Sequence, residues 1–309
     1  MTYFMALLGL GILLGAGDCL VKGAVNLSLR LGVPALIVSL TVVAFGTSAP
    51  ELLISIDAVL DGVPGLALGN VVGSNTANVL LVLGVPALIY GLDTSASEVR
   101  QTYTIMMGAS VLFTALAFFG PFTWWNALIL LAALAAILGM QLREGLATRV
   151  TPEEVEGADP GMAGWKIGVF LAIGLVGLPL GANILIDSAK EIAQSLGIPD
   201  SVIGLTMVAI GTSLPELATT FVAAAKRQAD VALGNVIGSN MFNLLAIIGI
   251  AALVGDIPVD ETFLRLDLWV MLAASLAMVP FVFTSARMTR PVGLAFCLLY
   301  GFYLWWVVG

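Results

Sequence analysis

The stretch GTSAPELLISIDAVLDGVPGLALGNVVGSNTANVLLVLG, residues 46–84, occurs a second time as GTSLPELATTFVAAAKRQADVALGNVIGSNMFNLLAIIG, residues 211–249. The two copies align without a gap at a constant offset of 165 residues, and 18 of the 39 aligned pairs are identical. Most of the identical positions are Gly, Ser, Thr, Asn, Pro or Glu, whereas many of the apolar positions differ. A duplication that keeps its polar residues in an apolar chain indicates a binding site to which both copies contribute.

The composition of the chain defines the environment of that site. Hydrophobic residues make up 60% of the 309 residues and charged residues only 10%, which is too few charges for the surface of a soluble domain. We therefore predict an all-α polytopic membrane protein, with the lipid bilayer as its partner and with no nucleic-acid partner and no obligate protein partner. The chain has no histidine, which excludes imidazole as metal ligand, base or proton shuttle. Its two cysteines lie in apolar segments and indicate neither a disulfide nor a metal site.

Ten apolar stretches are long enough to be transmembrane helices, five in each half of the chain. The predicted spans are residues 3–29, 34–62, 65–90, 99–119 and 122–142, followed by 165–195, 199–227, 230–254, 263–284 and 291–308. Residues 143–164 form the one long polar stretch and are predicted to be a cytoplasmic linker. Residues 1–142 and 165–309 are therefore predicted to be two five-helix repeats.

Five spans per repeat is an odd number, so the second repeat should enter the membrane from the opposite side. Inverted repeats of this kind recur in secondary transporters. With the N-terminus outside, ten of the twelve basic residues fall on the inner side: Lys22, Arg30, Arg100, Arg143, Arg149, Lys166, Lys226, Arg227, Arg287 and Arg290. Only Lys190 and Arg265 fall on the outer side. This excess of basic residues predicts that both termini are extracellular or periplasmic.

An acidic residue lies in the middle of the second span of each repeat. Glu51 and Glu216 are each 17 residues into a span, the first beginning at Pro34 and the second at Pro199. Each acid follows Gly-Thr-Ser-x-Pro, and because proline removes a helical hydrogen bond, we expect helices 2 and 7 to be broken there. A charge in the middle of the bilayer costs at least about 2.5–3.5 kcal/mol. No Lys or Arg lies at the same depth, so a cation or a proton should neutralise each acid.

The residue types at the two breaks favour a site for a hard cation. Broken helices expose carbonyl, hydroxyl and carboxylate oxygens, which are the ligands that Ca²⁺ and Na⁺ prefer. The next span of each repeat contains GN-x-x-GSN-x-x-N, in which Ser74 and Asn78, and likewise Ser239 and Asn243, lie one turn apart on one face. We expect all of these oxygens to line one central cavity, which could hold one divalent ion or several monovalent ions.

Other polar residues allow two interpretations. Asn75 and Asn240 either face the cavity or join helices through hydrogen bonds. The hydroxyls of the two GTS sequences could likewise satisfy backbone groups that the breaks set free. Asp18 and its repeat partner Asn183 could line a pathway or stabilise a contact between helices.

GTSAPE with GNVVGSNTAN, repeated as GTSLPE with GNVIGSNMFN, closely resembles the paired repeats of the sodium/calcium exchanger family within the cation/calcium antiporters. The motif regions cover about a quarter of the chain, and the number, spacing and inversion of the spans fit the family over its whole length. The resemblance implies an antiporter that exchanges Na⁺ for Ca²⁺, with no enzymatic activity and no cofactor. The sequence GTSxPE favours the sodium-coupled branch over the proton-coupled one.

The resemblance also implies roles for individual residues. Glu51 and Glu216 would be ligands shared by Ca²⁺ and Na⁺, joined for Ca²⁺ by the backbone carbonyls of Thr47 and Thr212. The other implied ligands are Ala44, Ser48, Ser74 and Asn78 in the first repeat and Ala209, Ser213, Ser239 and Asn243 in the second. The first helix of each repeat would slide across the others and open the cavity to alternate sides.

The family also carries implications for coupling. Some relatives, including the potassium-dependent branch, have aspartate at the position of Asn243, and two acids instead of three argue against K⁺ co-transport. Exchange of three Na⁺ for one Ca²⁺ would move one net charge, and the Na⁺ gradient would expel Ca²⁺. A Ca²⁺/H⁺ antiporter, a cation channel and an intramembrane enzyme remain alternatives. Inverted repeats with broken helices favour a carrier over a channel, and the absence of histidine disfavours an enzyme. The short loops indicate a plasma membrane of prokaryotic type.

Overall fold

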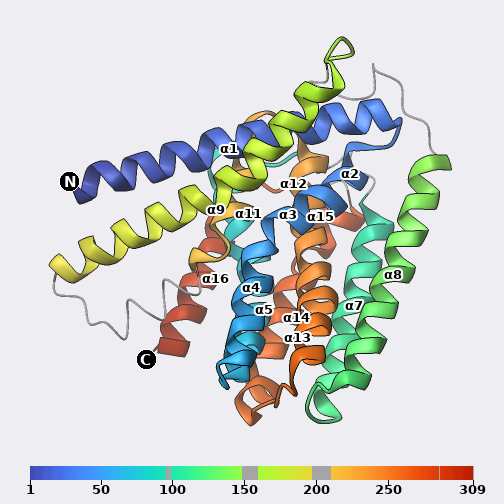
Figure 1. The fold of residues 1–309 in the computed structure, drawn as a ribbon, viewed down its shortest axis with the longest axis vertical. Coiled ribbons are helices and arrows are strands. Elements are labelled where there is room, and N and C mark those ends of the chain that lie inside the picture. The colour runs from blue at the N-terminus through green and yellow to red at the C-terminus, as the bar shows by residue number, and fades with distance from the viewer. Residues whose placement is uncertain (95–98, 148–158, 197–209, 285, 309) are drawn as a thin grey trace.

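Long apolar helices make up most of the chain in the computed structural model, which describes residues 1–94, 99–147, 159–196, 210–284 and 286–308 (Figure 1). In these residues eight helices are long and apolar enough to cross a membrane, or nine if the bent pair Ala35–Thr47 and Ala49–Leu60 is one span. Outside the helices, two isolated β-bridges are present in the same residues, Leu92–Met288 and Phe122–Ile257. The chain is therefore an all-α polytopic membrane protein, as predicted.

The first half of the chain follows the predicted spans closely. Its elements are α1 (Thr2–Leu31), α2 (Ala35–Val38), η1 (Ser39–Val43), α3 (Ala44–Thr47), α4 (Ala49–Leu60), α5 (Pro64–Ala77), η2 (Asn78–Val82), α6 (Gly84–Tyr90), α7 (Arg100–Phe118) and α8 (Trp124–Ala147). The η elements are single π-helical turns within longer spans. Helix α8 ends five residues later than the predicted end at residue 142, because its polar last turns continue as a helix beyond the apolar segment.

The second half contains the corresponding elements. They are α9 (Gly164–Ser195), α11 (Leu214–Ala225), α12 (Ala229–Met241), η4 (Phe242–Ile247), α13 (Ile248–Val254), η5 (Phe263–Asp267), α14 (Leu268–Leu276), α15 (Val279–Phe283) and α16 (Arg290–Val308). The span predicted for residues 199–227 is described only from Ile210 onward. The count of ten transmembrane helices therefore stays a prediction.

The helices α1 and α9 run alongside each other and obliquely to the other helices (Figure 1). Glycines bring their backbones together: a Cβ atom added at Gly9 would lie 2.7 Å from the backbone N of Leu185, and one added at Gly181 would lie 2.8 Å from the N of Leu13. Side chains at these positions would force the helices apart. The two helices therefore form one closely packed unit, which we call the α1–α9 pair.

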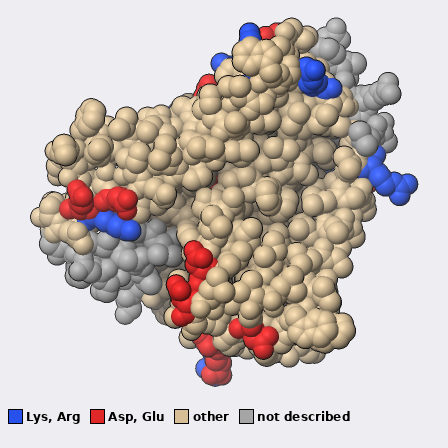
Figure 2. All heavy atoms as spheres, viewed as in Figure 1, with Lys and Arg blue, Asp and Glu red and all other residues tan. Residues whose placement is uncertain are grey.

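The outer surface of the molecule is suited to lipid. In Figure 2, uncharged side chains cover a broad area and the charged side chains gather at its margins. All six tryptophans are at least half exposed and lie near the ends of spans: Trp124, Trp125, Trp165, Trp269, Trp305 and Trp306. Such a distribution is typical of side chains at the two interfaces of a membrane.

The two spans that carry GN-x-x-GSN-x-x-N lie in the centre. In the 18-residue apolar segment of each span, the buried share is 72% for Pro64–Tyr90 and 89% for Ala229–Val254. The corresponding share is 17–44% for the other straight spans. Protein covers most of these two spans, and the polar side chains of the motif are buried, so they face other helices and not lipid. The fold thus places both copies of the motif in the interior.

Candidate functional site

The two GTSxPE sequences form helix breaks of the same geometry. Ser48 and Ser213 leave the helical conformation with nearly equal backbone angles, φ −86° and ψ 4° against φ −84° and ψ 5°. A new helix starts after each serine, with a proline at its first or second position, and the bend between α3 and α4 is 43°. Glu51 and Glu216 lie in the first turns of α4 and α11, where free backbone N–H groups favour a negative charge. The predicted break in the first repeat is therefore confirmed, and the start of α11 after Ser213 has the same local geometry, although residues 197–209 lie outside the described part of the chain.

Burial of the two carboxylates is complete. Glu51 is 1% exposed and Glu216 is 0% exposed, and the two side chains lie close enough to repel each other. Neither forms an ion pair with a Lys or Arg in the part of the chain that the structure describes. Two uncompensated negative charges inside a membrane protein need an external counter-charge.

Hydroxyl groups connect the breaks to the neighbouring copy of the motif. The Oγ of Ser48 donates to Oε1 of Glu216 at 3.2 Å, so the first break contacts the acid of the second. The Oγ1 of Thr47 lies 3.4 Å from the Oγ of Ser239, and the Oγ of Ser74 lies 3.3 Å from the Oγ1 of Thr212. These three contacts bring both breaks and both central spans to one place.

Several buried oxygens accept no hydrogen bond from the described residues. Among them are both carboxylate oxygens of Glu51, the Oε2 of Glu216, the amide oxygens of Asn78 and Asn243, and the hydroxyl of Ser213. Buried polar atoms are almost always paired in folded proteins. Buried oxygens without donors, contributed by both copies of the motif, are the type of ligand that a hard cation prefers.

Asn75 and Asn240 join helices, which decides between the two interpretations of these residues. Asn75 Nδ2 donates to the backbone O of Asn240 at 3.3 Å, and Asn240 Nδ2 returns a bond to the O of Asn75 at 3.5 Å. Their amide oxygens accept from the next amides: Asn78 donates to Asn240 at 3.0 Å and Asn243 to Asn75 at 3.1 Å. Because the donors of Asn78 and Asn243 are used in this way, their oxygens are left free.

A substitution in this amide pair should lower both stability and ion affinity, although it removes none of the unpaired oxygens. In Asn75→Ala, Asn243 loses the acceptor that fixes its amide, so its oxygen loses its orientation. We expect a loss of about 1–3 kcal/mol of stability, the usual cost of leaving a buried donor unpaired, together with a lower apparent Ca²⁺ affinity. Thermal unfolding in detergent and Ca²⁺-concentration curves of the reconstituted protein measure the two effects, and unchanged values of both would contradict the role of Asn75.

Asn70 and Asn235 were not among the predicted site residues. Asn70 Nδ2 donates to the backbone O of Glu51 and to the Oγ of Ser55, and Asn235 Nδ2 donates in the same way to the O of Glu216 and to the hydroxyl of Thr220. Both amides therefore fix the backbone of the acid that follows the break. The signal was present in the sequence, because the GN pair occurs in both copies.

Of the two alanines that the resemblance implies as ligands, the structure describes Ala44. Ala44 is fully buried, and its carbonyl accepts hydrogen bonds from the Oγ1 of Thr47 at 3.3 Å and from the N of Ser48 at 3.1 Å. Ala209 lies outside the described residues. No group of three or more His, Cys, Asp or Glu side chains gathers anywhere in the part of the chain that the structure covers. The two acids of the site are thus accompanied by neutral oxygens and not by a third acidic side chain in this part of the chain.

A polytopic helical protein with a buried, doubly acidic, oxygen-lined site in its centre has the properties of a membrane cation transporter. The model of the sodium/calcium exchanger protein family matches residues 1–143 and 166–309. A putative antiporter, CaxA of Alkalimonas amylolytica, is 32% identical over 95% of this chain and 93% of its own. The sodium/calcium exchanger MaX1 of Methanosarcina acetivorans is 33% identical over 97% of this chain and 96% of its own.

Comparison of the fold with solved structures points to the same family. The solved structure of the sodium-calcium exchanger NCX_Mj soaked with 10 mM Na⁺ and zero Ca²⁺ superposes with a TM-score of 0.84 and 31% identity, covering 98% of this chain and 97% of that one. The chain therefore belongs to the sodium/calcium exchanger family. These relatives are transporters and not enzymes, which confirms the class of protein that the sequence predicted.

Proposed function

We propose that this protein is a secondary active antiporter that exchanges Na⁺ for Ca²⁺ by alternating access, with both ions competing for Glu51 and Glu216. The observation that carries the proposal is the set of buried oxygens without hydrogen-bond donors. Two carboxylates balance the charge of one Ca²⁺, and the neutral oxygens around them provide further ligands for Na⁺. Thr47, Thr212, Ser48, Ser74 and the other predicted site residues belong to this proposal as ligands.

Competition for one cavity would enforce the exchange. An empty cavity holds two buried negative charges, which makes the passage between inward-open and outward-open states costly. Either ion load neutralises these charges and permits the passage. If three Na⁺ replace one Ca²⁺, one net charge moves in each cycle, and the membrane potential contributes about 2.3 kcal/mol per 100 mV. In a cell with a downhill Na⁺ gradient the direction would be Ca²⁺ extrusion.

The proposed membrane orientation follows from the basic residues. Ten of twelve fall on one side if residues 1–142 and 165–309 are inverted five-helix repeats joined by a cytoplasmic linker. The two segments matched by the family model support this division, since they end and begin close to the linker. Both termini would then be extracellular or periplasmic, in a plasma membrane.

The test is uptake of ⁴⁵Ca²⁺ into proteoliposomes that contain the purified protein and are loaded with Na⁺, at equal pH on both sides. We expect uptake under the outward Na⁺ gradient and its collapse when choline replaces internal Na⁺. An inside-positive potential should accelerate uptake if three Na⁺ leave for each Ca²⁺, because net positive charge then moves outward.

Two other outcomes would reject the sodium-coupled mechanism. Uptake that ignores Na⁺ and follows an imposed pH gradient would identify H⁺ as the coupling ion at the same carboxylates. Uptake that proceeds equally with choline inside and with no pH gradient would identify a cation channel.

A further inference from the structure

The α1–α9 pair contacts the rest of the protein differently on its two sides. On the α1 side, a Cβ added at Gly17 would lie 3.2 Å from the backbone O of Ala218, so α1 packs directly on α11. The positions that correspond to this contact at an offset of 165 residues are Ala182 and Leu53. Both of these line a cavity of about 310 Å³ between α9, α4 and residues 211–215 of the second break.

Exposure of the paired positions shows the same difference. Ala218 is 6% exposed, whereas its counterpart Leu53 is 63% exposed. The cavity on the α9 side also reaches Ala49, Pro50 and Thr212, which belong to the two helix breaks. In this conformation a cavity therefore reaches the helix breaks on the α9 side, whereas α1 packs on α11 on the other side.

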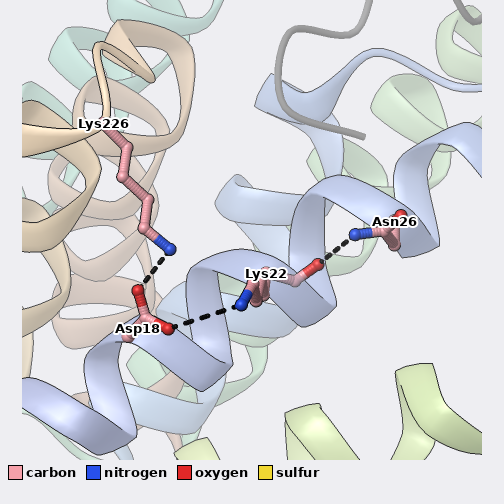
Figure 3. A network of polar contacts seen from close by, with 4 residues as sticks. All are labelled: Asp18, Lys22, Asn26 and Lys226. Carbon is pink, nitrogen blue, oxygen red and sulfur yellow. Dashed lines mark hydrogen bonds and ion pairs between the residues drawn. The ribbon is translucent and has the colours of Figure 1, made fainter. Parts of the chain in front are cut away.

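An ion pair lies on the α1 side (Figure 3). The carboxylate of Asp18 on α1 contacts the ammonium of Lys226, the residue at the end of α11, and its other oxygen is 4.0 Å from Lys22. Lys22 belongs to α1 itself, and its ammonium lies 5.7 Å from the ring centroid of Phe170 on α9. Of the two lysines, only Lys226 thus connects the α1–α9 pair to another helix.

The duplication did not preserve this ion pair. The counterpart of Asp18 is Asn183, which lines the cavity on the α9 side, and the counterpart of Lys226 is Asp61. An amide and a carboxylate cannot form an ion pair. Asn183 and Asp61 therefore cannot hold the α9 side closed through an ion pair of this kind.

We propose that Asp18 and Lys226 are functional residues of transport, whose ion pair selectively stabilises the conformation in which the α1 side of the site is closed. The proposal rests on the alternating access proposed above. With the orientation inferred from the basic residues, the closed side is cytoplasmic, so the ion pair keeps the empty or Na⁺-loaded site facing outward. Opening toward the cytoplasm requires that the two charges separate.

Removal of either charge should shift the conformational equilibrium. The two side chains are 42% and 34% exposed, and partly exposed ion pairs change an equilibrium by about 1.5- to 5-fold. For Asp18→Asn, which reproduces the residue of the other repeat, we expect the apparent Ca²⁺ affinity to rise on the α1 side and to fall on the α9 side by this factor. A merely structural role would lower stability without such a split between the sides.

The experiment is a double-mutant cycle of Asp18→Asn and Lys226→Gln with two readouts. The first is the apparent Ca²⁺ affinity from each side in oriented vesicles. The second is the labelling rate of Ala218→Cys with a water-soluble thiol reagent in a Cys19→Ser, Cys297→Ser background, with Leu53→Cys as the repeat-equivalent reference. We expect each charge removal to accelerate labelling at residue 218 by about 1.5- to 5-fold and the double variant to act no more strongly than either single variant.

Lys22→Gln is the matched control. It removes the lysine that contacts the same carboxylate from within α1, and it leaves the contact between Asp18 and Lys226 intact. The proposal is overturned if this control shifts the affinities as much as Lys226→Gln does, or if the effects of the two charge removals add. Labelling does not require exchange, so it tests the ion pair even where the wild-type protein shows no Na⁺-dependent Ca²⁺ uptake. An absence of Na⁺-dependent Ca²⁺ uptake by the wild-type protein would instead reject the proposed function.

Discussion

Replacing either buried acid by its amide, Glu51→Gln or Glu216→Gln, is expected to abolish exchange while the protein remains folded. The substitution keeps the shape of the side chain and removes one of the two charges that would balance Ca²⁺. Separating a buried charge from its partner costs about 3–5 kcal/mol, which corresponds to a loss of Ca²⁺ affinity of at least about a hundredfold. Both Na⁺-dependent ⁴⁵Ca²⁺ uptake and Ca²⁺-driven Na⁺ flux measure the loss in reconstituted protein.

Stability distinguishes this result from misfolding. In the absence of ions, each amide variant should unfold at the same temperature as the wild type or higher, because one of two mutually repelling buried charges is gone. Asp57→Asn is the control, since it neutralises an exposed acid on the same helix α4. Robust Ca²⁺-driven Na⁺ flux in either amide variant would contradict the proposed site.

The second large effect is expected at Gly238, where α12 meets the first broken span. A Cβ at this position would lie 2.6 Å from the Cβ of Ala44 and 2.6 Å from the backbone O of Leu40. Neither atom can move aside as a flexible side chain would, so Gly238→Ala must displace α12 or the α2–α3 segment. Overpacking of this kind costs about 1–3 kcal/mol, and the displacement moves the neighbouring Ser239, so exchange should fall about tenfold or more.

An alanine at a glycine with free space provides the comparison. Gly301 in α16 is exposed and has no heavy atom within 4 Å of an added Cβ, so Gly301→Ala should keep full exchange and equal or higher thermal stability. Thermal midpoints and initial ⁴⁵Ca²⁺ uptake rates of the two variants are compared directly. Equal values for Gly238→Ala and Gly301→Ala would show that the close contact of α12 with the first break is not needed.

Much of the fold could be predicted because its signals are local. Apolar segments of membrane length specify helices wherever they occur, since an unpaired backbone group is costly in lipid. Proline and glycine at positions 46–50 specify a break without reference to any other helix. The described ends of the spans accordingly lie near their predicted positions, with α8 extending furthest beyond its prediction.

The conserved offset between the copies also identified the acids and the hydroxyl and amide groups around them. Sequence alone determined that this protein has one apolar helical body and that two carboxylates lie inside it, because the residue types and their depth in a span are properties of the chain. Those properties are enough to require a cation or proton in the site.

Only the tertiary structure decided which of these polar groups are free. Asn75 and Asn78 are the same residue type in one motif, yet the first joins two helices and the second presents an unpaired oxygen. Asp18 likewise forms an ion pair that the local sequence does not reveal, because its partner Lys226 is distant in sequence. A hydrogen bond or an ion pair depends on which side chain from another helix lies within about 3 Å, and that neighbour is fixed by helix packing and not by the local sequence.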